Sequence, residues 1–254
     1  MAKRDCIRCG GTGWVVETRD GMSSADRCSC IAESQTQELE AHAQIPENYR
    51  KASFETFRLP KDNPTTQRGL ADVMLAVAAY SRNFPANEKP GLLLIGPPGT
   101  GKTHLAVSAL RLLIERGHEG IFFDYQNLLE QIRAGYNEKM GTSTREAYRT
   151  ALEMEVLLLD DLGAHRVTDW VEDTVTSIVT HRCNHRLPLI ATTNLADPEM
   201  GSTLVEKTAL GVGHAYKTTL EERIGERARS RLFEMCRVIR VPNAPDYRVR
   251  PYRT

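Results

Sequence analysis

The sequence predicts an α/β protein in which a five-stranded parallel sheet is covered by helices, with a small N-terminal module in front. Segments of helical periodicity alternate along the chain with short apolar runs at 92–95, 121–123, 156–159, 189–191 and 238–241. Such alternation predicts a parallel sheet with helices on both faces. A glycine-rich loop follows the first apolar run, and four of the six cysteines lie within the first 30 residues.

Length and composition limit the function. A chain of 254 residues with 41% hydrophobic content is long enough for one substantial domain and a small appendage. Basic and acidic residues both number 33, so only a local patch could attract nucleic acid. The N-terminus has no apolar core of a signal peptide, and the longest apolar runs are far too short for a membrane span. We therefore expect a cytoplasmic protein with no membrane contact.

Residues 1–30 are predicted to form a zinc-binding module. Cys6 and Cys9 precede a glycine-rich turn, and the pair Cys28 and Cys30 follows after a loop of hairpin length. In a reducing compartment this pattern favours a metal site over disulfides. Four thiolates without a histidine favour tetrahedral, structural Zn²⁺, with unligated thiols as the alternative. The remaining cysteines, Cys183 and Cys236, are expected to be small core residues.

The next segment, 31–60, is predicted to be a linker and lead-in to the main domain at 61–254. A short polar helix pattern follows Cys30 and is broken by Pro46. A second helix is predicted over 64–82, because Pro64 occupies an N1-like position and apolar residues follow at helical spacing.

The segment GPPGTGKT, at 96–103, is a complete phosphate-binding loop between an apolar run and a helix pattern. Its glycines allow backbone amides to surround phosphates, Lys102 reaches the β and γ oxygens, and Thr103 supplies a hydroxyl to Mg²⁺. ATP and Mg²⁺ are thus the expected cofactors. Nucleotide contacts are expected from Gly96, Pro97, Pro98, Gly99, Thr100, Gly101, Lys102, Thr103 and His104.

Two later apolar runs end in polar residues. VLLLDDLG places Asp160 where it can hold Mg²⁺, and Asp161 where it can orient the attacking water. The alternative is a pair of acids that caps a turn. PLIATTN ends in Asn194, whose amide could position the same water, although an asparagine taken alone is more typical of a turn.

Together, the segments IPENYRKASFETF, GPPGTGKTH, VLLLDDLG, ATTNL and ERIGERARSRLFEMC resemble the helicase-loader and transposition-helper branch of the AAA+ ATPases, the DnaC/DnaI and IstB group. The likeness covers about 45–241. It implies a P-loop AAA+ core with Lys102 and Thr103 as Walker A, Asp160 and Asp161 as Walker B, and Asn194 as sensor 1. Only a short segment follows Val241, so we expect neither a C-terminal helical lid nor a second sensor arginine from one.

Three arginines, Arg227, Arg229 and Arg231, occupy alternate positions of the predicted helix at 225–236 and therefore cannot share one partner. The resemblance assigns the arginine of the SRL segment, Arg231, to the γ-phosphate of a neighbouring chain, with Arg227 as runner-up. Arg229 is expected to be a solvated surface charge. The buried stripe of this helix is expected at Ile224, Leu232 and Met235.

Two segments admit more than one interpretation. The long connection 195–218 is expected to be a flexible loop, either a partner contact or a tolerated insertion. A candidate basic stripe mixes with glutamates, so a solvated helix face is at least as good an interpretation as a DNA site. That stripe comprises Arg133, Tyr136, Lys139, Arg145 and Arg149.

Three functions remain open. The first is an ATPase that loads a hexameric replicative helicase onto single-stranded DNA, with self-association and hydrolysis at subunit interfaces. The second is an IstB-like transposition helper. The third is a non-hydrolysing ATP-binding adaptor, which the second carboxylate suggests, because many relatives carry Glu at the position of Asp161. A zinc module without a basic tail favours the first over the second.

Overall fold

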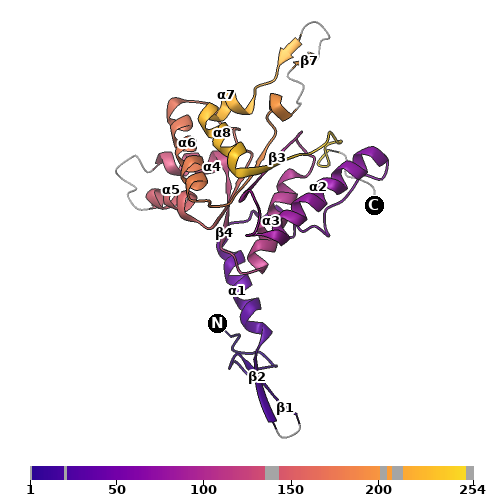
Figure 1. The fold of residues 1–254 in the computed structure, drawn as a ribbon, viewed down its shortest axis with the longest axis vertical. Coiled ribbons are helices and arrows are strands. Elements are labelled where there is room, and N and C mark those ends of the chain that lie inside the picture. The colour runs from indigo at the N-terminus through magenta and orange to yellow at the C-terminus, as the bar shows by residue number, and fades with distance from the viewer. Residues whose placement is uncertain (1, 20–21, 135–142, 201–204, 208–213, 250–254) are drawn as a thin grey trace.

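The structure is a computed structural model that describes residues 2–19, 22–134, 143–200, 205–207 and 214–249. At its N-terminus, strands β1 (Trp14–Arg19) and β2 (Met22–Arg27) form an antiparallel hairpin beside the cysteine cluster. Helix α1 (Ser29–His42) leads from this hairpin to the main domain (Figure 1). The far end of α1 is attached there, because the Phe122 amide donates to the Ala43 carbonyl at 2.8 Å.

The main domain is built on a five-stranded parallel sheet in the order β4-β5-β6-β3-β9. The strands are β3 (Gly91–Ile95), β4 (Gly120–Asp124), β5 (Val156–Asp160), β6 (Leu189–Thr193) and β9 (Cys236–Arg240). Each of them contains most of one predicted apolar run, so the predicted parallel sheet is confirmed. Side chains alternate across β3: Leu92 and Leu94 enter one core, and Leu93 and Ile95 enter the other.

Helices cover both faces of the sheet, as expected (Figure 1). One face packs against α2 (Pro64–Asn83) and α3 (Lys102–Glu115). The other packs against α4 (Tyr125–Ala134), α5 (Ser143–Glu153), α6 (Asp169–Asn184), α7 (Leu220–Ile224) and α8 (Glu226–Met235). The predicted helix start at Pro64 is confirmed, with the Asn63 side chain accepting from the Thr66 amide at 3.0 Å. The predicted stripe of α7 and α8 is buried at Ile224, Leu232 and Met235.

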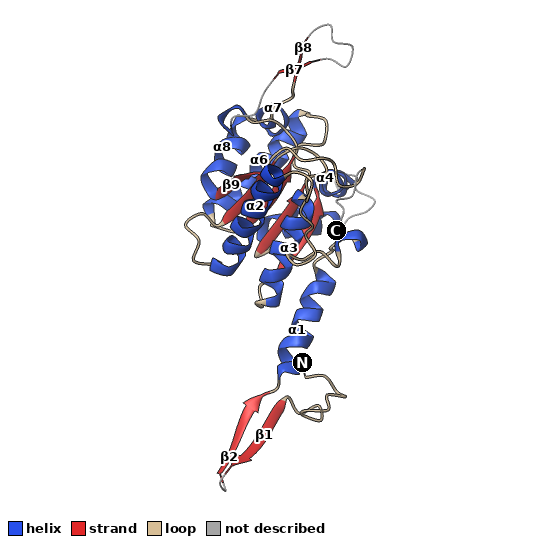
Figure 2. Ribbon diagram, turned by 90° about the vertical axis from the view of Figure 1, so that its right-hand side faces the viewer, coloured by secondary structure: helices blue, strands red, loops and turns tan. Residues whose placement is uncertain are grey.

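The remaining elements are short. A 3₁₀ turn, η1 (Glu47–Tyr49), lies in the lead-in, and a second, η2 (Pro198–Met200), follows β6. Strands β7 (Val205–Lys207) and β8 (His214–Tyr216) pair antiparallel within the segment expected to be a flexible loop, and they project from the sheet (Figure 2). Among the described helices, none is both long and apolar enough to cross a membrane.

The topology brings the polar residues together. In a parallel sheet the carboxyl ends of all strands meet at one edge, and ligands of such folds bind there. The phosphate-binding loop follows β3, Asp160 ends β5, Asn194 follows β6, and the C-terminal segment follows β9.

Candidate nucleotide-binding site

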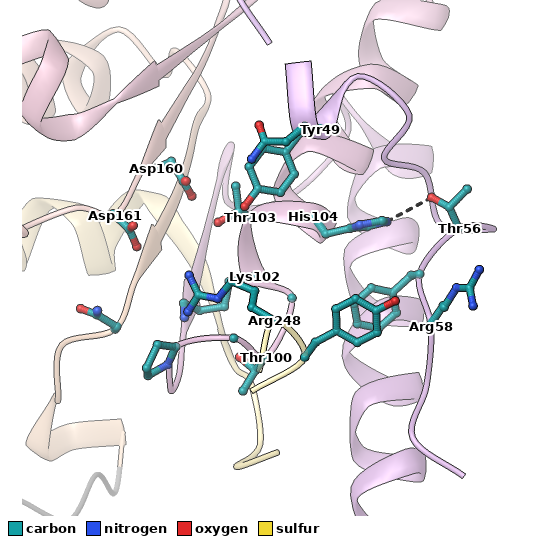
Figure 3. A pocket seen from close by; sticks show the side chains of 17 residues that line it. Tyr49, Thr56, Arg58, Thr100, Lys102, Thr103, His104, Asp160, Asp161 and Arg248 are labelled. Carbon is teal, nitrogen blue, oxygen red and sulfur yellow. Dashed lines mark hydrogen bonds between the residues drawn. The ribbon is translucent and has the colours of Figure 1, made fainter. Parts of the chain in front are cut away.

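A cavity of about 450 Å³ lies at the carboxyl edge of the sheet (Figure 3). It brings together residues from the end of β5, from the position after β6 and from the loop after β3. Ten predicted site residues line it: Pro98, Gly99, Thr100, Gly101, Lys102, Thr103, His104, Asp160, Asp161 and Asn194. Gly96 and Pro97, at the start of the loop, line a neighbouring cavity instead.

The phosphate-binding loop needs its glycines for space as well as for conformation. Gly99 and Gly101 have positive φ angles, 70° and 88°. A Cβ at Gly99 would collide with the Asp246 carboxylate, and one at Gly101 would lie 2.5 Å from the Phe57 ring. The loop therefore packs tightly between the lead-in and the C-terminal segment.

Lys102 begins helix α3 with its side chain inside the loop. The residue is 6% exposed, and its ammonium donates to the Pro97 carbonyl at 2.8 Å. An ammonium has three donors, so within the described chain two N–H groups remain for phosphate oxygens. Burial lowers the pKa of Lys102, while the charges of Asp161 and Asp160 oppose that shift.

The two carboxylates after β5 have different surroundings. Asp160 is buried, and its carboxylate accepts a 2.6 Å hydrogen bond from the Thr192 hydroxyl. Burial raises the pKa of Asp160 to about 6; the Thr192 bond opposes the rise and the Asp161 charge adds to it. Asp161 is exposed, and its backbone is in the left-handed region, with φ 53°. Its amide donates to the Thr192 hydroxyl at 3.0 Å. The Thr192 hydroxyl of β6 thus bonds the Asp160 carboxylate and the Asp161 backbone amide, a role that the sequence did not reveal.

The lead-in, part of the segment 31–60 that was predicted to be a linker and lead-in to the main domain, also lines the cavity. Its contributions are Asn48, Tyr49, Thr56, Phe57 and Arg58. His104 joins it to α3, because one ring nitrogen lies 2.9 Å from the Ser53 carbonyl oxygen and 3.2 Å from the Thr56 hydroxyl. The aromatic and polar residues of IPENYRKASFETF were the available signal.

Two further lining residues, Tyr247 and Arg248, come from the C-terminal segment. No motif marked them in the sequence.

Arg231 lies outside this cavity. It is exposed on α8, and its guanidinium bonds Glu234 at 2.7 Å. Arg227 is also exposed. The expectation for Arg229 was wrong: its side chain is 12% exposed and forms an ion pair with the fully buried Asp197. An aspartate three residues beyond Asn194 gave no sequence signal of this contact.

The candidate basic stripe lies partly outside the described residues, which include neither Tyr136 nor Lys139. Arg133 lies over the Trp170 ring, 5.9 Å from its centroid, and Arg149 forms a 2.9 Å ion pair with Glu153. These contacts are those of ordinary helix surfaces.

The four N-terminal cysteines converge as predicted. Their sulfur atoms all lie within 4.8 Å of one another, with Cys6 and Cys28 at 3.7 Å and Cys9 and Cys30 at 3.6 Å. Tetrahedral Zn²⁺ with bonds of about 2.3 Å needs sulfurs roughly 3.8 Å apart, so the cluster fits this ion. Cys9, Cys28 and Cys30 are buried, as a closed structural site requires. Of the other two cysteines, Cys236 is buried in the core and Cys183 packs partly buried against it.

The parallel sheet, phosphate-binding loop and strand-end carboxylates define a P-loop protein of the AAA+ class. More specifically, the chain belongs to the family of IstB-like ATP binding proteins, whose model matches residues 33–212.

Individual relatives agree with this assignment. The phage-like element PBSX protein XkdC of Bacillus subtilis is 24% identical over 207 residues, which cover 76% of this chain and 73% of that protein. The replicative helicase loader DnaC of Escherichia coli K12 is 23% identical over 159 residues, 63% of this chain and 62% of that protein.

Solved structures show the same fold. The crystal structure of the DnaC helicase loader matches with a TM-score of 0.60 and 29% identity, covering 78% of this chain and all of that one. The structure of DnaI matches with a TM-score of 0.57 at 18% identity, over 82% of this chain and 99% of that one. This chain is therefore a DnaC/IstB-like AAA+ protein.

Proposed function

We propose that this chain is an ATPase that loads a hexameric replicative DNA helicase onto single-stranded DNA. One observation carries the proposal: Lys102, the two strand-end carboxylates and Asn194 line one cavity in a chain with the fold of a helicase loader. The helicase is proposed as partner because of the resemblance to loaders, and ATP hydrolysis is proposed because of the residues in the cavity.

In this proposal the cavity binds ATP through its phosphates. Backbone amides of the loop and the Lys102 ammonium hold the phosphate oxygens. Thr103 and Asp160 would hold Mg²⁺, which neutralises charge between the β- and γ-phosphates when bound. The hydrogen bond from Thr192 keeps the Asp160 carboxylate in a fixed orientation for that role.

Hydrolysis needs a positioned water. Asp161 is exposed at the cavity, so its carboxylate is free to turn toward a water in front of the γ-phosphate. Asn194 faces the same cavity from the end of β6, and its amide can donate and accept at once. We assign the water to these two residues.

The last catalytic group is proposed to come from a neighbouring chain. Arg231 does not line its own cavity, and its exposed position on α8 allows it to reach a second copy. A guanidinium there would stabilise the charge that develops on the γ-phosphate. Self-association through the ATP sites follows from this assignment.

The zinc module is proposed as the contact for the helicase. Helix α1 holds the module away from the sheet (Figure 2), so it can bind a partner without covering the nucleotide cavity. Cys6, Cys9, Cys28 and Cys30 would hold the Zn²⁺ that folds it.

Co-purification tests the proposal. The tagged full chain, with ATP and Mg²⁺, is offered a purified hexameric replicative helicase and, in a parallel reaction, an IS21-type transposase. Retention of the helicase is expected, and Cys6→Ser should abolish it while the matched Cys183→Ser variant does not. Retention of the transposase alone would support the transposition helper, which the IstB-like family favours. ATP turnover, with and without single-stranded DNA, distinguishes both from the non-hydrolysing adaptor.

A further inference from the structure

The segment after β9 crosses the phosphate-binding loop. The Val241 amide donates to the Ile95 carbonyl at 2.7 Å, and the Tyr247 amide donates to the Gly99 carbonyl at 3.1 Å. Residues 242–249 form no helix, so within the described chain this segment is an irregular strap anchored near both of its ends. It brings Arg248 into the nucleotide cavity, next to Lys102 (Figure 3).

Arg248 is held in place by its neighbour Asp246. Its Nε lies 3.2 Å from one carboxylate oxygen, and its Nη2 lies 3.1 Å from the other. The Asp246 carboxyl in turn packs against Gly99, where a Cβ would collide with it. These hydrogen bonds with Arg248 hold the pKa of Asp246 below its usual range. The guanidinium is therefore oriented toward the loop, and its Nη1 is outside this pair.

Arg248 and Lys102 bring two basic side chains close together in the cavity. The cavity is lined by three basic side chains, Arg58, Lys102 and Arg248, and by the carboxylates Asp160 and Asp161, while the Asp246 carboxylate pairs with Arg248. Burial lowers the pKa of Lys102, and the nearby Arg248 charge acts in the same direction. Two cations close together repel each other, and a bound polyphosphate between them would offset this unfavourable electrostatic energy. A planar guanidinium suits phosphate oxygens particularly well, because it can donate two parallel hydrogen bonds.

We propose that Arg248 is a phosphate-binding residue of the nucleotide site, supplied by the C-terminal segment of the same chain. It contacts the γ-phosphate end of a nucleoside triphosphate, because it lies with Lys102 and close to the charge of Asp161. The inference rests on the proposed function only in requiring that this cavity takes ATP. It gives the chain an arginine at the phosphates from within the same subunit.

Nucleotide binding tests the inference. Affinities of the full chain for fluorescent ATP, ADP and AMP analogues are measured with Mg²⁺ for wild type, Arg248→Ala and Arg248→Lys. Arg237→Ala is the matched control, since Arg237 is an exposed arginine of β9 outside the cavity. Loss of one charge-assisted hydrogen bond predicts about tenfold weaker ATP binding for Arg248→Ala, a smaller change for ADP and none for AMP. Arg248→Lys should retain part of the affinity, because it keeps the charge and loses the fork.

Three outcomes would overturn the inference. ATP binding by Arg248→Ala equal to that of Arg237→Ala removes the phosphate contact. An equal loss for ATP, ADP and AMP assigns Arg248 to the folding of the strap, not to phosphate. If Lys102→Ala binds ATP as tightly as wild type, the nucleotide site itself is rejected. If Lys102→Ala binds ATP more weakly and Arg248→Ala binds it normally, only the role of Arg248 is rejected.

Discussion

Arg229 of helix α8 and Asp197 of the loop after β6 form a buried, two-pronged ion pair. The Arg229 Nε and Nη2 donate to the two Asp197 oxygens at 2.7 and 2.8 Å. The guanidinium also lies 4.5 Å from the centroid of the Phe233 ring. Hydrogen bonding to Asp197 raises the pKa of Arg229. Asp197 lies in the loop that follows Asn194, and Arg229 lies on the helix that carries Arg231. The pair therefore joins the loop after a cavity residue to the helix of the proposed arginine finger.

Arg229→Ala should therefore destabilise the protein, because it leaves the buried Asp197 carboxylate without its main partner. Breaking a buried pair costs about 3 kcal/mol, whereas an exposed pair contributes about 1 kcal/mol or less. Arg231→Ala is the matched control, since it removes an exposed arginine that pairs with Glu234 on the same helix. Urea unfolding without nucleotide should rank the variants in that order, and equal midpoints would contradict the role of the pair.

This contrast shows where sequence patterns lose information. Alternate positions on a helix predicted that the arginines differ in environment, and the apolar spacing correctly predicted the stripe at Ile224 and Leu232. The partner of Arg229 lies 32 positions earlier in the sequence, in a loop. Periodicity reports which face of a helix is buried, but it does not report which loop supplies a carboxylate to that face.

The nucleotide cavity shows the same division. The loop with Lys102 and the acids after β5 were predictable, because their local sequence encodes both conformation and chemistry. Thr192, Tyr49 and Arg248 were not predicted, because their positions depend on tertiary packing: the pairing of β5 with β6, the docking of the lead-in on α3, and the strap across Gly99. Local sequence thus predicts the groups assigned to phosphate better than it predicts the residues that position those groups.

The buried Asp160 predicts an unusual dependence of stability on pH. Burial raises its pKa from 3.8 to about 6, so between these values the folded state binds more protons than the unfolded state. The contribution of Asp160 to the free energy of unfolding is therefore fully present below pH 3.8 and is lost as the pH rises through 6. The two pKa values differ by 2.2, which corresponds to about 3 kcal/mol.

Asp160→Asn isolates this contribution, because asparagine is neutral at every pH and can still accept from Thr192. In urea unfolding without nucleotide, the variant should match wild type near pH 4 and exceed its stability by up to about 3 kcal/mol at pH 7. A difference that is the same at both pH values would mean that Asp160 titrates normally.

The cysteine cluster predicts one Zn²⁺ per chain. Its apolar contacts form a cluster separate from the two cores that cover the sheet. Cys6→Ser or Cys28→Ser should therefore lose the metal and unfold the N-terminal module, while ATP binding stays near that of wild type. Elemental analysis and nucleotide titration measure the two effects, and Cys183→Ser is the control with a full zinc content. Wild type purified without chelator and found free of zinc would reject the site.

Binding and hydrolysis should separate at Lys102 and Asp161. Lys102→Ala should weaken ATP binding, because it removes the ammonium that is assigned to the phosphates. Asp161→Asn should bind ATP normally and slow turnover by about a hundredfold or more, since it loses the group that activates water. Asparagine also tolerates the left-handed backbone at this position, so the turn after β5 should persist. Normal turnover by Asp161→Asn would exclude its assigned role.

The position of Arg231 predicts catalysis across subunits. Its side chain lies on α8 and does not line its own nucleotide cavity, so the proposed role requires that it acts on a site in another chain. Arg231→Ala and Lys102→Ala should each be nearly inactive, with a loss of about a thousandfold if the arginine acts as in other phosphoryl-transfer enzymes.

Mixing these two variants should restore part of the ATPase activity, because some interfaces then join an intact phosphate site from the Arg231→Ala chain to an intact arginine from the Lys102→Ala chain. A control mixture of Arg231→Ala with the Lys102→Ala/Arg231→Ala double variant contains no such interface and should stay inactive. Steady-state turnover is measured at concentrations where wild type assembles. Full activity of Arg231→Ala alone would remove its role and leave Arg227, also exposed on α8, as the next residue to test.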